Sequence, residues 1–210
     1  MSSTKPRAKR SIIAPADVNR RAQRNRLILY VTIGLIVAIL IAVVAFYSRV
    51  PKSASNAPIQ SNIKVGDVAP EFSVATTAGP FDLKSALAAG RPVLLEVFAT
   101  WCPHCQHETA VLNKLYGQFH DRADIVAVSG NPYGMDGSTP ESQADVIHFQ
   151  QEFDVKYPIA FDPTLGVADK YLSNGYPTLV VIDKAGKVSY LTSGETPQKT
   201  LATAIDKALQ

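Results

Sequence analysis

The chain from residue 63 to residue 210 alternates between short apolar runs and amphipathic stretches. The runs over 92–99 and 124–130 are rich in β-branched and other apolar residues, which is typical of strands buried on both faces. The stretch 103–119 predicts a helix instead, because its apolar residues recur at helical spacing, at Ala110, Val111, Leu112, Leu115 and Phe119.

Strand and helix patterns continue to alternate on either side of these elements. Residues 131–140 are dense in Gly, Pro, Asn, Asp and Ser, which indicates a loop. The other predicted elements are strands over 72–77 and 157–162, a turn and short helix over 81–90, helices over 141–153 and 164–175, and a hairpin of 177–183 and 187–192 that turns at Gly186.

A closing helix is predicted over 196–209, with Thr196 as its cap and Pro197 at its first position. Strand–helix alternation followed by a hairpin and a helix implies an α/β domain. We expect a mixed central sheet flanked by helices on both faces.

The segment from Leu27 to Tyr47 has a different pattern, with no charged residue and no proline. As a helix it would be about 31 Å long, which matches a hydrocarbon core of roughly 30 Å. It therefore predicts an N-terminal transmembrane signal-anchor helix. A cleaved signal peptide is the alternative, with 53–57 as a loose cleavage site, although its apolar core is usually only about 7–15 residues long.

The distribution of charged residues on either side of this span predicts its orientation in the membrane. Eight Lys and Arg residues precede residue 27, against the single acid Asp17, whereas thirteen basic and seventeen acidic residues follow. The positive-inside rule places a basic tail, 1–26, in the cytoplasm and the domain outside the cell membrane. Residues 48–62 read as a flexible linker and 63–210 as the globular domain. Because the domain itself is mildly acidic, nucleic-acid binding is not expected.

The two cysteines of the chain, Cys102 and Cys105, lie together where the strand 92–99 gives way to the helix 103–119. A helix start favours negative charge, so a thiolate there is stabilised and reactive. The spacing lets the second sulfur reach the first across one turn, so the pair can close a disulfide or resolve a mixed one. Pro103 suits a first helical turn, and a protonated His104 would favour the thiolate further.

Two other uses of such a pair fit less well. A zinc site needs four ligands, and no second cysteine or histidine cluster is present; only His104 and His107 lie close. A purely structural disulfide would close too short a loop to remove much chain entropy. We therefore expect redox chemistry and no resident metal.

The segment Trp101-Cys102-Pro103-His104-Cys105, after a buried strand and before a helix, resembles the active site of the thioredoxin superfamily. Residues 65–74 resemble the opening of its redoxin branch, which includes membrane-anchored TlpA-like proteins. Residues 175–183 resemble the segment that carries the family's cis-proline. The resemblance covers nearly all of 63–210 and implies a thioredoxin-like fold with no bound cofactor.

The resemblance also implies roles for particular residues. Pro177 would be cis, and the backbone of Tyr176 would pair with a substrate peptide. Glu96 stands where thioredoxins have a buried aspartate, so its carboxyl, with a raised pKa, would exchange a proton with Cys105. Partners would be extracytoplasmic proteins with cysteines and a redox partner protein.

The direction of electron flow stays open at this point. A Pro-His pair between the cysteines resembles the DsbA-type oxidases, whereas the overall frame resembles TlpA-like proteins, many of which are reductases. Two rival functions remain as well: a thiol peroxidase of the peroxiredoxin type, although Ala99 stands where those enzymes have threonine, and a non-enzymatic copper or metal carrier that uses Cys102, Cys105 and a histidine.

Overall fold

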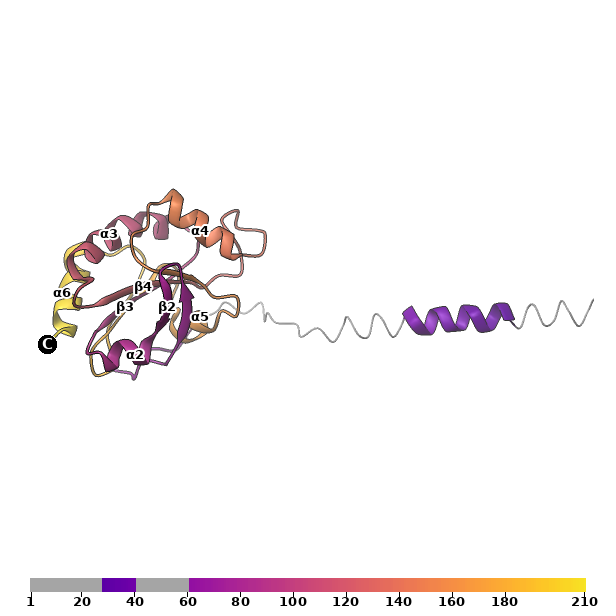
Figure 1. Cartoon of the computed structure of the whole chain (residues 1–210), viewed down its shortest axis with the longest axis horizontal. Helices are drawn as coiled ribbons and strands as arrows, with labels where there is room; N and C mark the ends of the chain where they lie inside the picture. The colour runs from indigo at the N-terminus through magenta and orange to yellow at the C-terminus, as the bar shows by residue number, and fades with distance from the viewer. Residues whose placement is uncertain (1–27, 41–60) are drawn as a thin grey trace, which may run out of the picture. The chain divides into compact units, whose positions relative to one another are not determined.

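The computed structural model describes residues 28–40 and 61–210. Residues 28–40 form a helix, and residues 61–210 belong to a separate compact unit (Figure 1). Neither described range contains a helix that is both long and apolar enough to span a membrane. The predicted tail 1–26, much of the predicted span and most of the linker lie outside these ranges.

Within 61–210, seven strands form one mixed sheet in the order β2-β1-β5-β4-β3-β6-β7. Strand β4 pairs in parallel with β3 and β5, and the other neighbours are antiparallel. The strands are β1 (Ser73–Thr76), β2 (Gly79–Asp82), β3 (Val93–Phe98), β4 (Asp124–Ser129), β5 (Ile159–Phe161), β6 (Thr178–Ile182) and β7 (Val188–Ser193). The predicted mixed sheet is confirmed.

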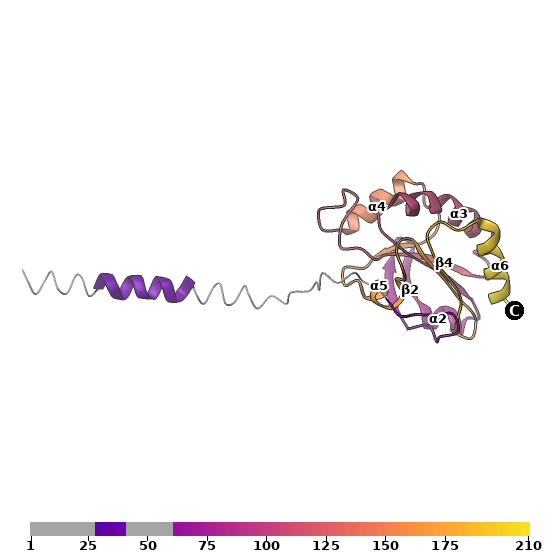
Figure 2. The same ribbon diagram turned by 180° about the vertical axis from the view of Figure 1, so that it is seen from behind.

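Helices cover both faces of the sheet, and the two views show α3, α4 and α6 on one side with α2 and α5 on the other (Figures 1 and 2). Two separate apolar clusters fill the two interfaces. The helices are α2 (Leu83–Ala88), α3 (Pro103–Phe119), α4 (Gln143–Glu152), α5 (Gly166–Tyr171) and α6 (Gln198–Ala208).

The side chains of the central strand β3 alternate between the two faces of the sheet, and those on one face lie under α3, the helix that carries the cysteines. Successive side chains of a strand point to opposite faces. Leu94 and Phe98 belong to the cluster under α3, whereas Leu95 and Val97 belong to the cluster under α5. Glu96 alternates with Leu95 and Val97, so the carboxylate of an otherwise apolar strand faces the interface with α3.

Several predicted boundaries were wrong. The first residues of 81–90 belong to β2, which pairs with β1 across a turn where Gly79 has φ of 117°. Helix α5 ends at Tyr171 instead of Gly175.

Another error concerns the start of α6. Pro197 is its N-cap and Gln198 its first residue. The side chain of Thr196 does not cap the helix, because its hydroxyl donates to the Gly194 carbonyl and its backbone amide donates to Glu108.

Candidate active site

The two cysteines occupy the start of α3. Cys102 is the N-cap, Pro103 is the first helical residue and Cys105 lies in the first turn, as predicted. The backbone amide of Cys102 donates to the Ala99 carbonyl at 3.0 Å, which closes the turn between β3 and α3. Both side chains are buried, and both sulfurs are free thiols. The structure therefore describes the reduced, dithiol form of the pair.

The environments of the two thiols shift their pKa values in opposite directions. The pKa of Cys102 falls to about 6, first because the Cys105 thiol hydrogen-bonds to it, and then because the amides of Cys105 and His104 at the helix start favour the thiolate. Burial raises the pKa of Cys105 far above its usual value, and the contact with Cys102 and the charge of Glu96 add to that. Of the two thiols, Cys102 is therefore the one that ionises more readily, and Cys105 holds its proton more tightly.

Glu96 lies in the interior, with its side chain 2 % exposed. Its Oε2 accepts a hydrogen bond from the Tyr157 hydroxyl at 3.4 Å, while its Oε1 has no partner among the described residues. Burial, followed by repulsion from Glu108, raises its pKa well above the usual range. The sequence predicts this buried carboxylate, but it gives no sign of Tyr157.

Glu108 is a second buried carboxylate that sequence reasoning missed. It lies one turn after Cys105 on α3, and its Oε2 accepts the Thr196 amide at 2.9 Å. Its Oε1 has no hydrogen-bond partner within the described ranges. Burial raises its pKa to about 7. The i, i+3 spacing from a buried cysteine is the one sequence signal that points to it.

His104 points away from the interior and is exposed. Its Nδ1 lies 2.7 Å from Glu195 Oε1, and His107 Nδ1 lies 3.2 Å from the same oxygen. The hydrogen bond with Glu195 raises the pKa of His104 and lowers that of Glu195. His104 also lowers the pKa of Cys102, as expected from the sequence, but less than Cys105 and the helix amides do.

The loop that joins α5 to β6 completes the site. The Tyr176–Pro177 peptide bond is cis, as the resemblance implies. The carbonyl of Tyr176 accepts a hydrogen bond from the Cys102 thiol, with 3.9 Å between sulfur and oxygen. The predicted pair Tyr176 and Pro177 therefore lies beside the Cys102 sulfur.

Trp101 stands next to Tyr176, with the two rings edge to face and their centres 6.2 Å apart. The indole Nε1 donates to Asn131 Oδ1 at 3.0 Å. The predicted loop 131–140 is thus tied to the redox turn, and Asn131 was not singled out from the sequence.

The same loop is attached a second time through Glu141, which is buried. Its Oε1 accepts from the Thr100 hydroxyl at 3.0 Å, and its Oε2 accepts from the Ser129 hydroxyl. Burial raises its pKa to about 7. Glu141 therefore joins the end of the loop to the residue that precedes Trp101.

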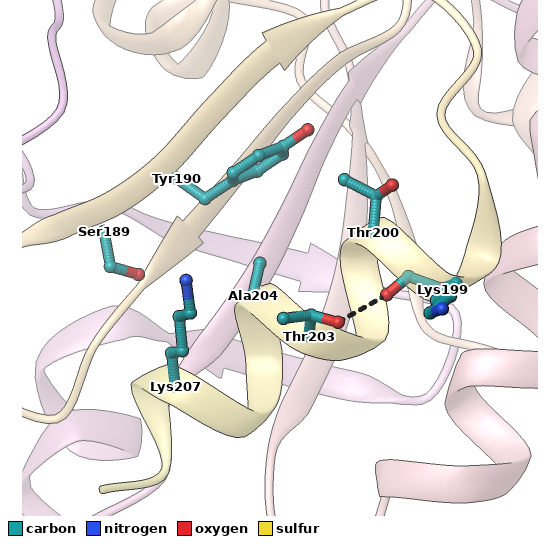
Figure 3. Close-up of a pocket in the computed structure, with 7 residues that line it drawn as sticks. All are labelled: Ser189, Tyr190, Lys199, Thr200, Thr203, Ala204 and Lys207. Carbon is teal, nitrogen blue, oxygen red and sulfur yellow. Dashed lines mark hydrogen bonds between the residues drawn. The ribbon is translucent and has the colours of Figure 1, made fainter.

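A surface hollow lies elsewhere, between β7 and α6. It measures about 370 Å³, and Figure 3 shows its lining, Ser189, Tyr190, Lys199, Thr200, Thr203, Ala204 and Lys207. None of these residues belongs to the cysteine site, so the cysteine pair and the hollow are separate features. In the described residues, no group of three or more His, Cys, Asp or Glu side chains could hold a metal ion.

Comparison with known proteins agrees with this geometry. Residues 65–191 match the AhpC/TSA family. The chain is 32% identical over 146 residues to the thioredoxin-like protein YneN of Bacillus subtilis, which covers 69% of this chain and 80% of that protein. It is 28% identical over 150 residues to the thiol-disulfide oxidoreductase ResA of Bacillus cereus, covering 70% of this chain and 80% of ResA.

Among solved structures, a putative thiol:disulfide interchange protein DsbE from Chlorobium tepidum has a TM-score of 0.61 and 26% identity, over 71% of this chain and 100% of that one. The sequence match, the fold and the cysteine pair all indicate the same family. The chain belongs to the AhpC/TSA family and is a redoxin of the thioredoxin superfamily.

Proposed function

We propose that this chain is a membrane-tethered thiol–disulfide oxidoreductase that exchanges disulfides with extracytoplasmic proteins. The observation that carries the proposal is the asymmetry of the two thiols: the pKa of Cys102 is lowered to about 6, whereas that of Cys105 is raised. A nucleophile beside a protonated resolving thiol is what disulfide exchange requires. The similarity to thiol-disulfide oxidoreductases supports the same activity.

The reduced site reacts in two steps. The Cys102 thiolate attacks one sulfur of the partner's disulfide, so a mixed disulfide forms and the partner's other sulfur leaves as a thiolate. Cys105 then loses its proton and attacks Cys102, which releases the partner's second thiolate and leaves a Cys102–Cys105 disulfide. The partner is reduced by two electrons and the enzyme is oxidised by two. The reverse sequence oxidises a partner.

Glu96 is the proposed proton acceptor for Cys105. Its charge already acts on the Cys105 thiol, and its Oε1, which has no hydrogen-bond partner among the described residues, is proposed to take the proton directly or through a water. Because its pKa is raised, the carboxyl keeps a proton to a higher pH than usual and can return it to Cys105 in the reverse direction. Tyr176 and Pro177 are proposed to hold the partner, since the Tyr176 carbonyl already faces the Cys102 sulfur.

The membrane tether rests on the sequence from Leu27 to Tyr47 and on its flanking charges. The described part, the helix 28–40, supports it, because large apolar residues stand on its surface all along: Ile28, Leu29, Tyr30, Val31, Ile33, Leu35, Ile36, Val37, Ile39 and Leu40. Such a helix fits a lipid environment. Extraction of cell membranes with alkaline carbonate tests this, because an anchored chain stays in the pellet.

The exchange activity itself is tested by mixing the reduced full chain with insulin and counting the thiols that appear on insulin. We expect a stoichiometric reaction that Cys102→Ser abolishes. Consumption of peroxide faster than of insulin disulfide would favour the peroxidase alternative. Copper that stays bound in stoichiometric amount after dialysis would favour a metal carrier.

A further inference from the structure

The site depends on a contact between two loops that are far apart in sequence. The Cys102 thiol and the Tyr176 carbonyl meet although 74 positions separate them. One loop joins β3 to α3, and the other precedes β6. The hydrogen bond between the two loops is long, so other contacts are needed to fix the position of one loop relative to the other.

The segment Gly130–Asn131, directly after β4, binds both loops. Asn131 Oδ1 accepts from the Trp101 indole at 3.0 Å, which fixes the residue next to Cys102. The Tyr176 hydroxyl donates to the Gly130 carbonyl at 2.6 Å, and Asn131 Nδ2 reaches the same hydroxyl at 3.4 Å. One amide side chain therefore contacts an aromatic residue from each loop.

The segment Gly130–Asn131 is itself held in place by close packing against its neighbours. The Gly130 amide donates to the Phe98 carbonyl at 2.9 Å. A Cβ at Gly130 would lie 2.5 Å from Val97 Cγ1 and 2.9 Å from Ala168 Cβ, so the backbone is pressed against β3 and α5. Because the segment is packed this closely, it can act as a fixed reference for the two loops.

We propose that Asn131 is a positioning residue for partner binding, which holds Trp101 and Tyr176 in the arrangement that lets a polypeptide disulfide reach Cys102. The inference rests on the proposed disulfide exchange. Asn131 touches neither sulfur in the described contacts, and it does not contribute to the lowered pKa of Cys102. Its effect should therefore fall on docking of a polypeptide, and the intrinsic reactivity of the thiolate should stay the same.

The test compares Asn131→Ala with Asn113→Ala in the full chain. Asn113 is a matched control: it is also half-buried, and it also joins two segments, through hydrogen bonds to Asp154 and Lys156 remote from the cysteines. The reduced protein is mixed with increasing insulin in single turnover, and separately with hydroxyethyl disulfide, which is too small to need the aromatic pair.

We expect Asn131→Ala to raise the insulin concentration for half-maximal rate at least about fivefold, because it removes the hydrogen bonds of Asn131 with Trp101 and Tyr176. The limiting rate and the reaction with hydroxyethyl disulfide should stay within about twofold of wild type. The emission of Trp101, the single tryptophan, should shift because its Nε1–H loses its acceptor. Asn131→Asp keeps the oxygen acceptor, so it should restore the emission and much of the insulin reaction.

An unchanged insulin dependence in Asn131→Ala, or an equal loss with both disulfides, would overturn the proposal, and so would the same defect in Asn113→Ala. If Asn131→Ala does not fold, Asn131→Asp and Asn131→Ser decide the same question through the ratio of the two rates. A wild-type chain that reacts with neither disulfide would instead refute the proposed function, and the inference would fall with it.

Discussion

The outer and inner halves of the site each hold a cysteine thiol, and they shift its pKa in opposite directions. The outer half, which we define as Trp101, Cys102 and Tyr176, surrounds a thiol whose pKa is lowered to about 6. The inner half, defined as Cys105, Glu96, Glu108 and Tyr157, surrounds a thiol whose pKa is raised. Three positions along one helix start separate the two sulfurs.

The difference comes from what faces each sulfur. Cys102 meets backbone amides and a thiol donor, all of which favour negative charge. Cys105 meets apolar neighbours and the charge of Glu96, both of which disfavour it. We therefore propose that the outer half attacks the partner's disulfide and that the inner half holds a proton until resolution. Substitution of single residues in either half tests this difference.

The largest effect is expected from replacing the sulfurs one at a time. Cys102→Ser should lower the rate of exchange with insulin by about a thousandfold or more, because it removes the nucleophile. Cys105→Ser should still attack but should not resolve, so a covalent adduct with insulin should accumulate on a non-reducing gel. Adducts that form through Cys105 in the Cys102→Ser protein would contradict the division.

The next largest effect is expected from Glu96→Gln. The amide cannot take the Cys105 proton, so resolution of the mixed disulfide should slow by about 100-fold, within the usual range for general acid–base catalysis. Alkylation of Cys102 by iodoacetamide should keep its rate. Stopped-flow measurement of both steps separates them, and Glu152→Gln on the surface of α4 is the control. A resolution rate equal to that of wild type would remove Glu96 from the mechanism.

Glu108 makes a prediction about stability and pH. Its pKa is raised to about 7 in the folded chain from the model-peptide value of 4.5, so the folded state binds the proton more tightly. The resulting stability is complete below pH 4.5 and is lost as the pH rises through 7. Glu108→Gln cannot ionise, so its melting temperature should exceed that of wild type by about 3 °C at pH 8.

At pH 5 the melting temperatures of Glu108→Gln and wild type should nearly coincide. Thermal unfolding followed by Trp101 emission at both pH values measures the difference. Because Glu141 also has a pKa raised to about 7, Glu141→Gln should show the same sign. A variant less stable than wild type at pH 8 would mean that the charged carboxylate stabilises the fold.

The smallest effect is expected at His104. His104→Gln removes a positive charge that favours the thiolate and leaves Glu195 with His107 as its remaining described partner, so the pKa of Cys102 should rise from about 6 to roughly 6.5. The pH dependence of alkylation by iodoacetamide measures this value. His107→Gln, which removes the other histidine contact of the same carboxylate oxygen, is the matched control and should leave the pKa of Cys102 nearly unchanged. A larger rise with His107→Gln would reverse the roles of the two histidines.

The sequence predicted those parts of the site that local signals specify. The cysteine spacing, Pro103 and the helical period placed α3 at its observed bounds, and the lone carboxylate in an apolar strand pointed to Glu96. The sheet followed from the alternation of buried strands and helices.

The rest of the site is assembled by tertiary contacts that no local pattern announces. Tyr157 reaches Glu96 from 61 positions away, and Glu195 reaches His104 from 91. Thr196 reads as a helix cap in the sequence, yet its amide is used by Glu108 across 88 positions. Asn131 sits in a stretch whose composition predicts only a loop, and its function depends on where Trp101 and Tyr176 lie.

Equilibration of the full chain with glutathione buffers of graded potential shows whether Cys102 and Cys105 act as one redox couple, with the free thiols counted by mass spectrometry after alkylation. We expect one two-electron transition in which Cys102 and Cys105 lose both thiols together, and its midpoint, compared with the potential of the compartment, gives the direction of electron flow. Thiols that persist at every potential, or glutathione that remains bound to Cys102 while Cys105 stays free, would contradict this expectation.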